Sequence, residues 1–288
     1  MVRVAFATYR EAPALTDDDR LAADALRERG VEAQPAVWNA ADVAWDRFAL
    51  IVIRSTWDYP DHPVAYARWV ESFLPTPRRL WNPPRVVLST LDKRYLIELG
   101  QQGVTVVPTA VITAADEEPL RAILDRYGWN HVVIKPAVSA SARGTWRSRR
   151  AAAADDEARF LEQRRGRDLL VQPFCPEIVA VGEWSLVFFA GEYSHAVLKQ
   201  PAIGDFRVQR QFGGRPAVAA PSARLVEQAA AILPRLGGPL LYARVDGIER
   251  DGDLVLMELE VNEPHLFLSS SREAPARFAD AIVRALGR

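Results

Sequence analysis

Two glutamates stand one residue apart near the end of the chain, in the run L-M-E-L-E-V-N-E-P over residues 256–264. The run predicts a β-strand, and alternate side chains of a strand point to the same face, so Glu258 and Glu260 should lie side by side. The strand-like run before it, residues 242–249, carries a third acid, Asp246. Three carboxylates on one sheet face repel one another unless a cation or protons neutralise them.

The connection between the two runs decides whether the third acid meets the other two. A two-residue loop, Asp251-Gly252, would turn Asp246 to the opposite face. We expect the three-residue loop 251–253 instead, because three-residue hairpins with a glycine in the left-handed conformation are common. That loop pairs Asp246 with Glu258, and Arg244 with the second glutamate. Oxygen ligands of this kind suit Mg²⁺, which commonly also contacts phosphates, and a solvated sheet face is the alternative that the pattern leaves open.

A second group of candidates follows the buried-strand run V-V-I-K-P at residues 132–136, where small and hydroxylated residues continue to residue 145. A turn of small residues exposes backbone N–H groups that bind phosphate oxygens, and a lysine supplies a point charge. The alternative is a flexible hairpin turn with a lysine that reaches solvent. The Walker loop G-x-x-x-x-G-K-[ST] is absent. The candidates in this stretch are Lys135, Ser139, Ser141, Arg143, Gly144 and Thr145.

Three further positions suit a nucleotide. The run Gln172-Pro173-Phe174 ends a buried strand and offers a backbone edge beside an apolar wall, which can hold an adenine ring. Glu183 follows and could reach ribose hydroxyls. Arg207, which precedes the pair Gly213-Gly214, suits a transferring phosphoryl group or a substrate carboxylate. An ordinary strand end, a solvated turn glutamate and a surface arginine are the respective alternatives.

The elements that must position these residues fall into three lobes. Residues 1–84 alternate strand-like and helix-like segments, which is typical of a parallel sheet with helices on its faces. A proline-rich stretch at residues 75–84 indicates a linker. Later strand-like runs are separated by tight turns, which predicts an antiparallel sheet. The sequence therefore predicts a chain that is α/β and then α+β, with an N-terminal domain at 1–84, a central domain at 85–174 and a C-terminal domain with the metal site at 175–288.

Composition narrows the class of protein. Of the 288 residues 49% are hydrophobic, which is enough for a large core. The net charge of −1 gives no reason to expect a nucleic-acid partner or a membrane surface. Cys175 is the only cysteine, so no internal disulfide can form. No apolar run approaches the ~20 residues that span a bilayer, and the N-terminus lacks a signal-peptide layout. We expect a cytoplasmic protein without a membrane or nucleic-acid partner.

Taken in order, the acids, the lysines Lys93 and Lys135 and the small-residue turn resemble the ATP-grasp superfamily, in particular its glutathione-synthetase-like carboxylate–amine ligases. That resemblance covers residues 90–268. The chain is also similar to the small ATP-grasp proteins that include D-cycloserine synthetase, over nearly its full length. Four runs carry this closer likeness, at residues 55–59, 92–96, 195–199 and 258–264. It implies an ATP-grasp fold, with a Rossmann-like N-terminal lobe followed by central and C-terminal ATP-grasp subdomains.

The resemblance also implies a role for each candidate. Glutathione synthetase usually has asparagine at its second metal position, where this chain has Glu260. ATP and Mg²⁺ are implied, with two ions and with Mn²⁺ as a substitute. The implied metal ligands are Asp246, Glu258 and Glu260. The implied nucleotide-binding residues are Lys93, Lys135, Ser139, Ser141, Arg143, Gly144, Thr145, Gln172, Pro173, Phe174 and Glu183, and the catalytic residues are Arg207 and Lys135. Substrate-binding candidates are Arg54, Trp57, Tyr59 and Glu263.

The implied reaction is ATP-dependent amide formation through an acyl phosphate. In the closer relatives it is intramolecular, as in the cyclisation of O-ureido-D-serine to D-cycloserine, and the partner is a small amino-acid-like molecule. The alternatives are an intermolecular amino-acid or peptide ligase and a non-catalytic ATP-binding regulatory module. We interpret His195 and Lys199 as structural. The sequence leaves the oligomeric state open, a homodimer included.

Overall fold

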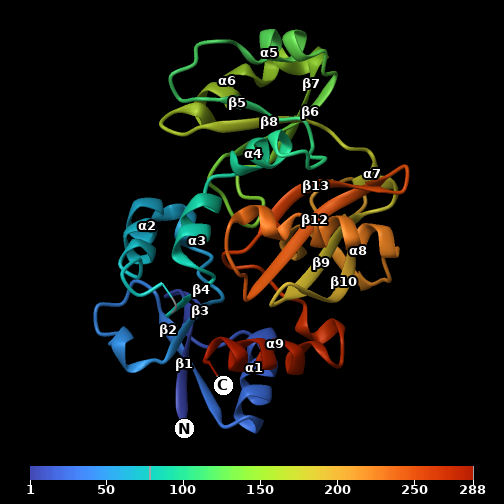
Figure 1. Ribbon diagram of the computed structural model, residues 1–288. Helices are drawn as coiled ribbons and strands as arrows, with labels where there is room; N and C mark the ends of the chain where they lie inside the picture. The colour runs from blue at the N-terminus through green and yellow to red at the C-terminus, as the bar shows by residue number, and fades with distance from the viewer. Residues whose placement is uncertain (78, 288) are drawn as a thin grey trace.

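The computed structural model describes residues 1–77 and 79–287, which contain three sheets arranged in three lobes (Figure 1). The N-terminal sheet has the strand order β2-β1-β3-β4, and its strands pair in parallel, as the sequence predicts. β4 lies inside the stretch 75–84 that we expected to be a linker, and Arg78 of that stretch lies outside the described residues. The strands are β1 (Val2–Thr8), β2 (Val31–Val37), β3 (Leu50–Ile53) and β4 (Leu80–Trp81).

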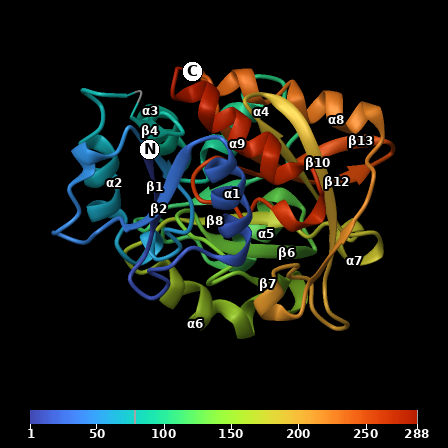
Figure 2. The same ribbon diagram turned by 90° about the horizontal axis from the view of Figure 1, so that it is seen from below.

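The two faces of the N-terminal sheet have separate cores because alternate residues of β1 point to opposite sides. Val4 and Phe6 pack with helices α1 (Asp17–Glu28) and α9 (Ala274–Ala285). On the other side an aromatic cluster surrounds α2 (Pro63–Glu71). Figures 1 and 2 both show α9, the last helix of the chain, lying beside α1. The end of the chain thus covers the first sheet.

The central lobe is an antiparallel sheet with the order β5-β8-β6-β7, drawn at the top of Figure 1. Its core joins the sheet to helices α5 and α6. The elements are β5 (Ala110–Ile112), α5 (Leu120–Tyr127), β6 (His131–Pro136), β7 (Trp146–Arg149), α6 (Ala153–Arg164) and β8 (Leu169–Pro173).

The C-terminal sheet is antiparallel, with the order β11-β10-β9-β12-β13. One of its faces shares a core with α8, and also with α3 and α4 from earlier in the chain. The elements are α3 (Pro84–Thr90), α4 (Tyr95–Gln101), α7 (Glu177–Ala180), β9 (Glu183–Phe189), β10 (Glu192–Gln200), β11 (Arg215–Val218), α8 (Ala223–Ala230), β12 (Tyr242–Arg250) and β13 (Asp253–Glu260). Short 3₁₀ segments lie at Trp45–Arg47, Tyr59–Asp61, Arg150–Ala152, Arg210–Phe212, Leu233–Leu236 and Leu268–Ser270.

The predicted domain ranges do not each coincide with one hydrophobic core. Helix α3 begins at the boundary of the range 85–174 and α4 lies within that range, but both helices pack against the C-terminal sheet. Helix α9, in the range 175–288, packs against the N-terminal sheet. The boundaries after residues 84 and 174 therefore remain predictions. None of the helices in the described part of the chain combines the length and apolar composition that crossing a membrane requires.

The β12–β13 hairpin corrects the loop that we expected. Arg250 pairs with Asp253, so the loop has the two residues Asp251 and Gly252, and both have positive φ angles, 54° and 82°. That combination is typical of a tight type I′ turn, for which Asp-Gly is a favoured sequence. The register then shifts by one residue in a β-bulge after Asp246. The prediction of a three-residue loop was wrong because a bulge, invisible in the sequence, supplies the odd residue instead.

Candidate active site

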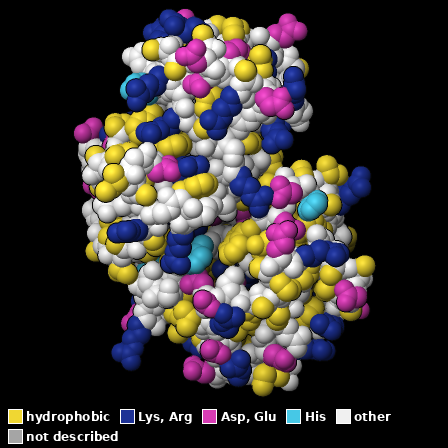
Figure 3. Space-filling view, turned by 180° about the vertical axis from the view of Figure 1, so that it is seen from behind, with side chains coloured by type: hydrophobic (Ala, Val, Ile, Leu, Met, Phe, Trp, Pro, Cys, Tyr) yellow, Lys and Arg dark blue, Asp and Glu magenta, His cyan; other side chains and the backbone are white. Residues whose placement is uncertain are grey.

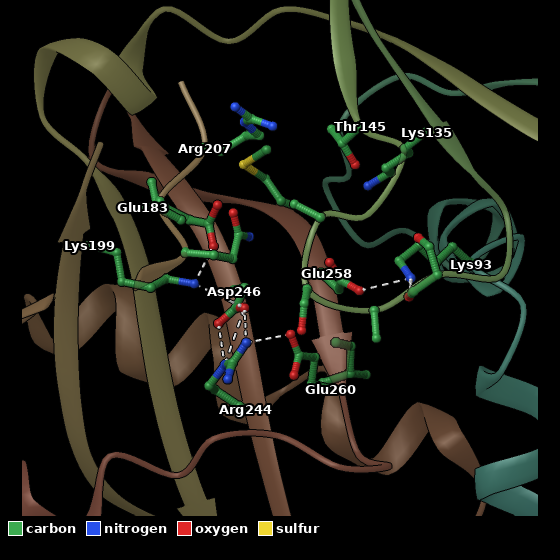
Figure 4. Close-up of a pocket in the computed structure, with 18 of the residues that line it drawn as sticks. Lys93, Lys135, Thr145, Glu183, Lys199, Arg207, Arg244, Asp246, Glu258 and Glu260 are labelled. Atoms are coloured by element: carbon green, nitrogen blue, oxygen red, sulfur yellow. Dashed lines mark hydrogen bonds and ion pairs between the residues drawn. The ribbon is translucent and has the colours of Figure 1, made fainter. Parts of the chain in front are cut away.

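A cavity of about 380 Å³ lies where the three lobes meet, and residues from all of them line it. That volume is within the usual range for small-molecule sites. Charged side chains of both signs and a histidine surround a hollow in the middle of the face drawn in Figure 3. Figure 4 shows the side chains of the predicted acids and lysines gathered in this region. The acids come from β12 and β13, Lys135 from β6 of the central sheet, and Lys93 from the segment between α3 and α4.

The three predicted acids share one face of the hairpin and all line the cavity. The bulge places Met257 as the extra residue, so Asp246 pairs across the ribbon with Glu258, while Arg244 pairs with Glu260. These are the pairs that we expected, reached through a different loop. Met257 itself also lines the cavity.

Asp246 is buried and accepts hydrogen bonds from three neighbouring side chains. Ser185 Oγ donates at 2.6 Å, Lys199 Nζ at 3.2 Å and Arg244 Nη2 at 2.7 Å. Burial raises the pKa of Asp246, but Arg244 and Lys199 outweigh that effect and lower it. The acid is thus held ionised by cations from the same sheet.

Each glutamate pairs with a different cation. Glu258 Oε1 lies 3.2 Å from Lys93 Nζ, and Glu260 forms an ion pair with Arg244. Burial raises the pKa of Glu258, but Lys93 and Lys135 outweigh it and lower the value. For Glu260 burial prevails over Arg244 and raises the pKa to about 7. Of the three acids, Glu260 is therefore the one whose charged form its surroundings stabilise least.

This donor set fits a divalent cation such as Mg²⁺. The facing ligands are carboxylate oxygens, which Mg²⁺ prefers, and because burial raises the pKa of Glu260, a further cation would stabilise its charged form. Within residues 1–77 and 79–287 no three acidic, histidine or cysteine side chains are already gathered as a metal site. Since Arg244 and Lys93 contact the glutamates, an ion that enters must replace one of these contacts. The metal role of the three acids stays a prediction.

Both predicted lysines lie at the cavity. Lys93 is 5% exposed and also donates to the backbone oxygen of Ser139. Lys135, at the end of β6, is 9% exposed. Burial lowers the pKa of Lys135, Glu258 counteracts that, and Lys93 lowers the value further. Two ammonium groups at one cavity suit a ligand with several negative charges, such as a polyphosphate.

The predicted phosphate-binding residues divide into two groups. Ser139, Ser141 and Thr145 line the cavity, whereas Arg143 and Gly144 do not. Arg143 Nη1 lies 2.5 Å from Asp61 Oδ2 in the N-terminal lobe. We expected Arg143 to contact phosphate. In the structure its guanidinium instead joins the loop of residues 139–145 to the opposite lobe.

The predicted adenine end is also only partly at the cavity. Gln172 and Pro173 line it, while Phe174 does not. The ring of Phe174 packs edge-on against Phe206 at 6.3 Å, and the Arg147 guanidinium lies 5.1 Å from its centre. We expected Phe174 to contact the base, but it lies outside the cavity lining and packs against Phe206, which is part of that lining.

Glu183, expected at the ribose, lines the cavity and forms an ion pair with Lys199 at 2.5 Å. Arg207 lines the cavity as well. It pairs with Asp205 at 2.8 Å, and its guanidinium lies 3.6 Å from the centre of the Phe212 ring. Arg207 is partly exposed and lies at the upper edge of the view in Figure 4, above Glu183.

Three of the four substrate candidates line the cavity, namely Trp57, Tyr59 and Glu263. Trp57 Nε1 donates to the backbone oxygen of Glu263 at 3.1 Å. Burial, and then Glu260, raise the pKa of Glu263 to about 8. Arg54 is different, because it is 2% exposed, does not line the cavity and pairs with Asp19 at 2.7 Å. The expectation that Arg54 binds substrate is therefore not supported by its position.

Three residues of the cavity lining were assigned no site role from the sequence. Arg244, Lys199 and His265 line the cavity, and we had interpreted Lys199 as structural. A signal existed for two of them. Arg244 is two residues from Asp246 and so shares its face, and Lys199 pairs across strands with Glu183. For His265, which follows β13, the sequence offered position alone.

Known proteins resemble this chain in sequence and in fold. A family model described as the N-terminal domain of D-cycloserine synthetase DcsG matches residues 4–82. The cycloserine biosynthesis protein DcsG of Streptomyces lavendulae is 31% identical over 283 residues, which cover 91% of this chain and 92% of that protein. A crystal structure of D-cycloserine synthetase DcsG has a TM-score of 0.86 and 30% identity, and the match covers 99% of both chains.

A more distant solved structure shares the architecture. The D-alanine–D-alanine ligase from Bacillus anthracis, complexed with ATP, matches with a TM-score of 0.69 at 15% identity, over 100% of this chain and 98% of that one. At this identity the match shows the fold alone.

Proposed function

The chain belongs to the D-cycloserine synthetase family of ATP-grasp ligases, and we propose that it closes an amide bond within one amino-acid-like molecule. Its substrate in this proposal is O-ureido-D-serine, and the product is D-cycloserine. ATP activates the substrate carboxylate as an acyl phosphate, and a nitrogen of the same molecule then displaces phosphate. Tethering the nitrogen to the carboxylate raises its effective concentration.

The observation that supports this proposal most is the meeting of acids and cations in one cavity. Asp246 and the two glutamates face the cavity from β12 and β13, and Lys93 and Lys135 face them from the other side. Transfer of a phosphoryl group from ATP requires acids that bind divalent cations and, opposite them, lysines that bind phosphate oxygens. No side-chain nucleophile is needed for either step.

The roles follow from position. Magnesium, when bound, would neutralise charge on the phosphates, and Asp246, Glu258 and Glu260 would hold it. Lys93 and Lys135 would orient the phosphates, and Arg207 would stabilise the charge that develops on the transferred group.

The two ends of the cavity would bind the rest of the ligands. Trp57, Tyr59 and Glu263 would bound the amino-acid end of the cavity. Ser139, Ser141 and Thr145 would contact the phosphates, with Gln172, Pro173 and Glu183 around the nucleoside.

A phosphate-release screen tests the proposal. The enzyme is incubated with ATP, Mg²⁺ and a panel of amino acids that includes O-substituted serines of both configurations. We expect that O-ureido-D-serine is the only panel member that causes phosphate release, and that D-cycloserine forms from it without a second amine. A requirement for a second amine would favour the intermolecular ligase. Tight ATP binding without release for any panel member would favour the non-catalytic module.

Two finer features also belong to the proposal. Titration with Mn²⁺ in the presence of a non-hydrolysable ATP analogue should give two bound ions, and Mn²⁺ should support turnover. For a homodimer, light scattering should give twice the chain mass of 32.1 kDa. One ion, or a mass equal to that of a single chain, would contradict the respective feature.

A further inference from the structure

His265 follows the carboxylate-bearing strand β13 and lines the cavity. Its side chain is 31% exposed, so a small molecule in the cavity can reach it. No candidate role was assigned to it from the sequence. Because it lies at the same cavity as the acids, the protonation state and the tautomer of its imidazole decide what it can bind.

The backbone around His265 is unusually well fixed, because side chains from three different elements donate to its carbonyl groups. A side chain on such a segment needs little reorganisation to bind a ligand. The contacts are Trp57 Nε1 to Glu263 O at 3.1 Å, Arg244 Nη1 to His265 O at 3.0 Å and His195 Nε2 to Leu266 O at 2.9 Å.

The hydrogen bond to Nδ1 determines the tautomer of His265. The backbone N–H of Phe267 donates to this nitrogen at 3.1 Å, so Nδ1 must present a lone pair. In the neutral ring the proton then lies on Nε2. Among the residues that the structure describes, no partner is assigned to Nε2. The ring presents a fixed N–H donor, and protonating Nδ1 would break the contact with Phe267.

The surroundings keep the ring uncharged. Burial lowers the pKa of His265 to about 4, and three guanidinium groups, Arg244, Arg210 and Arg54, lower it in the same direction. Asp19 counteracts them, and Asp18 Oδ2 lies 3.8 Å from Nδ1. These charged groups come from β12, the loop around residue 210, the end of β3 and helix α1. A neutral donor in a positively charged environment suits an oxygen acceptor.

We propose that His265 binds the amino-acid-like substrate by donating a hydrogen bond from Nε2–H to one of its carboxylate or carbonyl oxygens. The ring therefore does not act as the base that accepts a proton from the attacking nitrogen. This inference rests on the proposed function, since it takes the substrate of that reaction as the ligand. It adds a specificity-determining residue that none of the motifs includes.

Two variants separate a donor from a structural side chain. His265→Gln keeps an N–H group near the position of Nε2, whereas His265→Leu keeps the bulk and removes the donor. Losing one hydrogen bond to a substrate costs about 10-fold in affinity. We expect His265→Leu to raise the KM for O-ureido-D-serine about 10-fold and to leave the KM for ATP within about 2-fold, and we expect His265→Gln to recover most of the loss. The exposed His131, changed to Gln, is the matched control.

The pH profile gives an independent readout. If His265 only donates, kcat/KM of the wild type and of His265→Gln should have the same shape between pH 5 and 8. Loss of one limb in the variant would show that the ring acts as a base. An unchanged KM for the amino acid in His265→Leu, or an equal rise in both KM values, would also overturn the proposal.

Nitrogen-15 NMR of the histidine rings tests the geometry without turnover. We expect a pyrrole-type signal for Nε2 of His265 and a pyridine-type signal for Nδ1, unchanged from pH 5.5 to 8. The opposite tautomer, or titration in that range, would overturn the proposal. If the wild type turns over no panel member, the proposed function is contradicted, but that result alone does not contradict the inference about His265. The tautomer, together with calorimetric binding of O-ureido-D-serine to wild type and His265→Leu, then still decides this inference.

Discussion

Two regions face each other across the cavity, and they are held in place very differently. On the β12–β13 hairpin, Asp246 is buried, and three side chains of its own sheet hold it. The loop of residues 139–145 is held by groups that reach out from other segments. Its contacts with Asp61, through Arg143, and with Gln211 lie among exposed side chains. The hairpin is thus a rigid platform. The loop is a cover that buried Lys93 anchors at Ser139, while solvent can replace its contacts with Asp61 and Gln211.

Backbone conformation shows the same contrast. The hairpin has its positive φ angles in a two-residue turn, where they are expected. In the loop, Ser141 and Ala142 have φ angles of 55° and 54°, although neither is glycine. Such conformations cost about 1 kcal/mol or more each for residues with a side chain. The shape of the loop therefore depends on its contacts, and the cover should be easier to displace than the platform.

The largest effect should come from an acid of the platform. Glu258→Gln removes the charge that pairs with Lys93 and, in the proposed function, a metal ligand. We expect phosphate release to fall by at least about 10²-fold, since such groups act on charge that develops during transfer. Glu249→Gln, on the same hairpin but outside the cavity lining, is the control. Normal turnover in Glu258→Gln would show that the metal assignment is wrong.

The second test changes the bulge that aligns the platform. A Cβ on Gly247 would lie 2.6 Å from the backbone oxygen of Val255, so Gly247→Ala must shift one strand against the other. We expect the free energy of unfolding to fall by about 1–3 kcal/mol in urea denaturation, with a loss of activity because the pairing of the acids moves. Gly238→Ala, whose Cβ would meet its first neighbour only at 3.4 Å, should change less.

The third test measures how the free energy of unfolding depends on pH, and it concerns His265 in the segment that follows the platform. The pKa of His265 is about 4 in the folded protein and ~6.5 when unfolded. Between these values the unfolded chain binds more protons, so the free energy of unfolding should decrease as pH falls from 6.5 to 4. His265→Gln should weaken this dependence in urea midpoints measured at pH 7, 5.5 and 4.5. An identical decrease in both proteins would contradict the assignment.

The smallest effect should come from the cover. The Arg143–Asp61 pair is about half exposed on both sides, 48% and 57%, and such pairs contribute ~0–1 kcal/mol. We expect Arg143→Ala to change the free energy of unfolding by less than about 1 kcal/mol and the KM for ATP by a few-fold at most. Arg126→Ala, which breaks an exposed pair within the central lobe, is the control. A loss comparable to that of Glu258→Gln would remove the distinction between platform and cover.

Sequence reasoning found the platform more completely than the cover, for a physical reason. Strand periodicity places alternate side chains on one face, so the E-x-E pattern was enough to bring Glu258 and Glu260 together. The partner of Asp246 came out as expected, yet through a loop of the wrong length, because a bulge and a short turn changed the register in compensating ways. Register in a hairpin depends on local geometry that residue types do not encode uniquely.

Side-chain direction in loops and at strand ends was the weaker part. Arg143 and Phe174 follow strands that were correctly located, but each packs away from the cavity. Arg54 stands at the end of β3, where the edge of a parallel sheet often binds ligands, and a buried partner, Asp19, holds it elsewhere. Such outcomes depend on residues far away in the chain. They could not follow from patterns that consider neighbours in the sequence.

The position of helix α9 has a consequence for how the protein is made. Its Phe278 completes the core over Val4 and Phe6 of β1, so a strand is covered by a helix that is made much later. Until α9 is made, α1 covers that face of the first sheet without it, and the apolar surface left exposed favours aggregation and chaperone binding. Nascent chains arrested before residue 274 should be cut by protease within the first sheet, whereas their central lobe, whose core is complete by residue 173, should already resist.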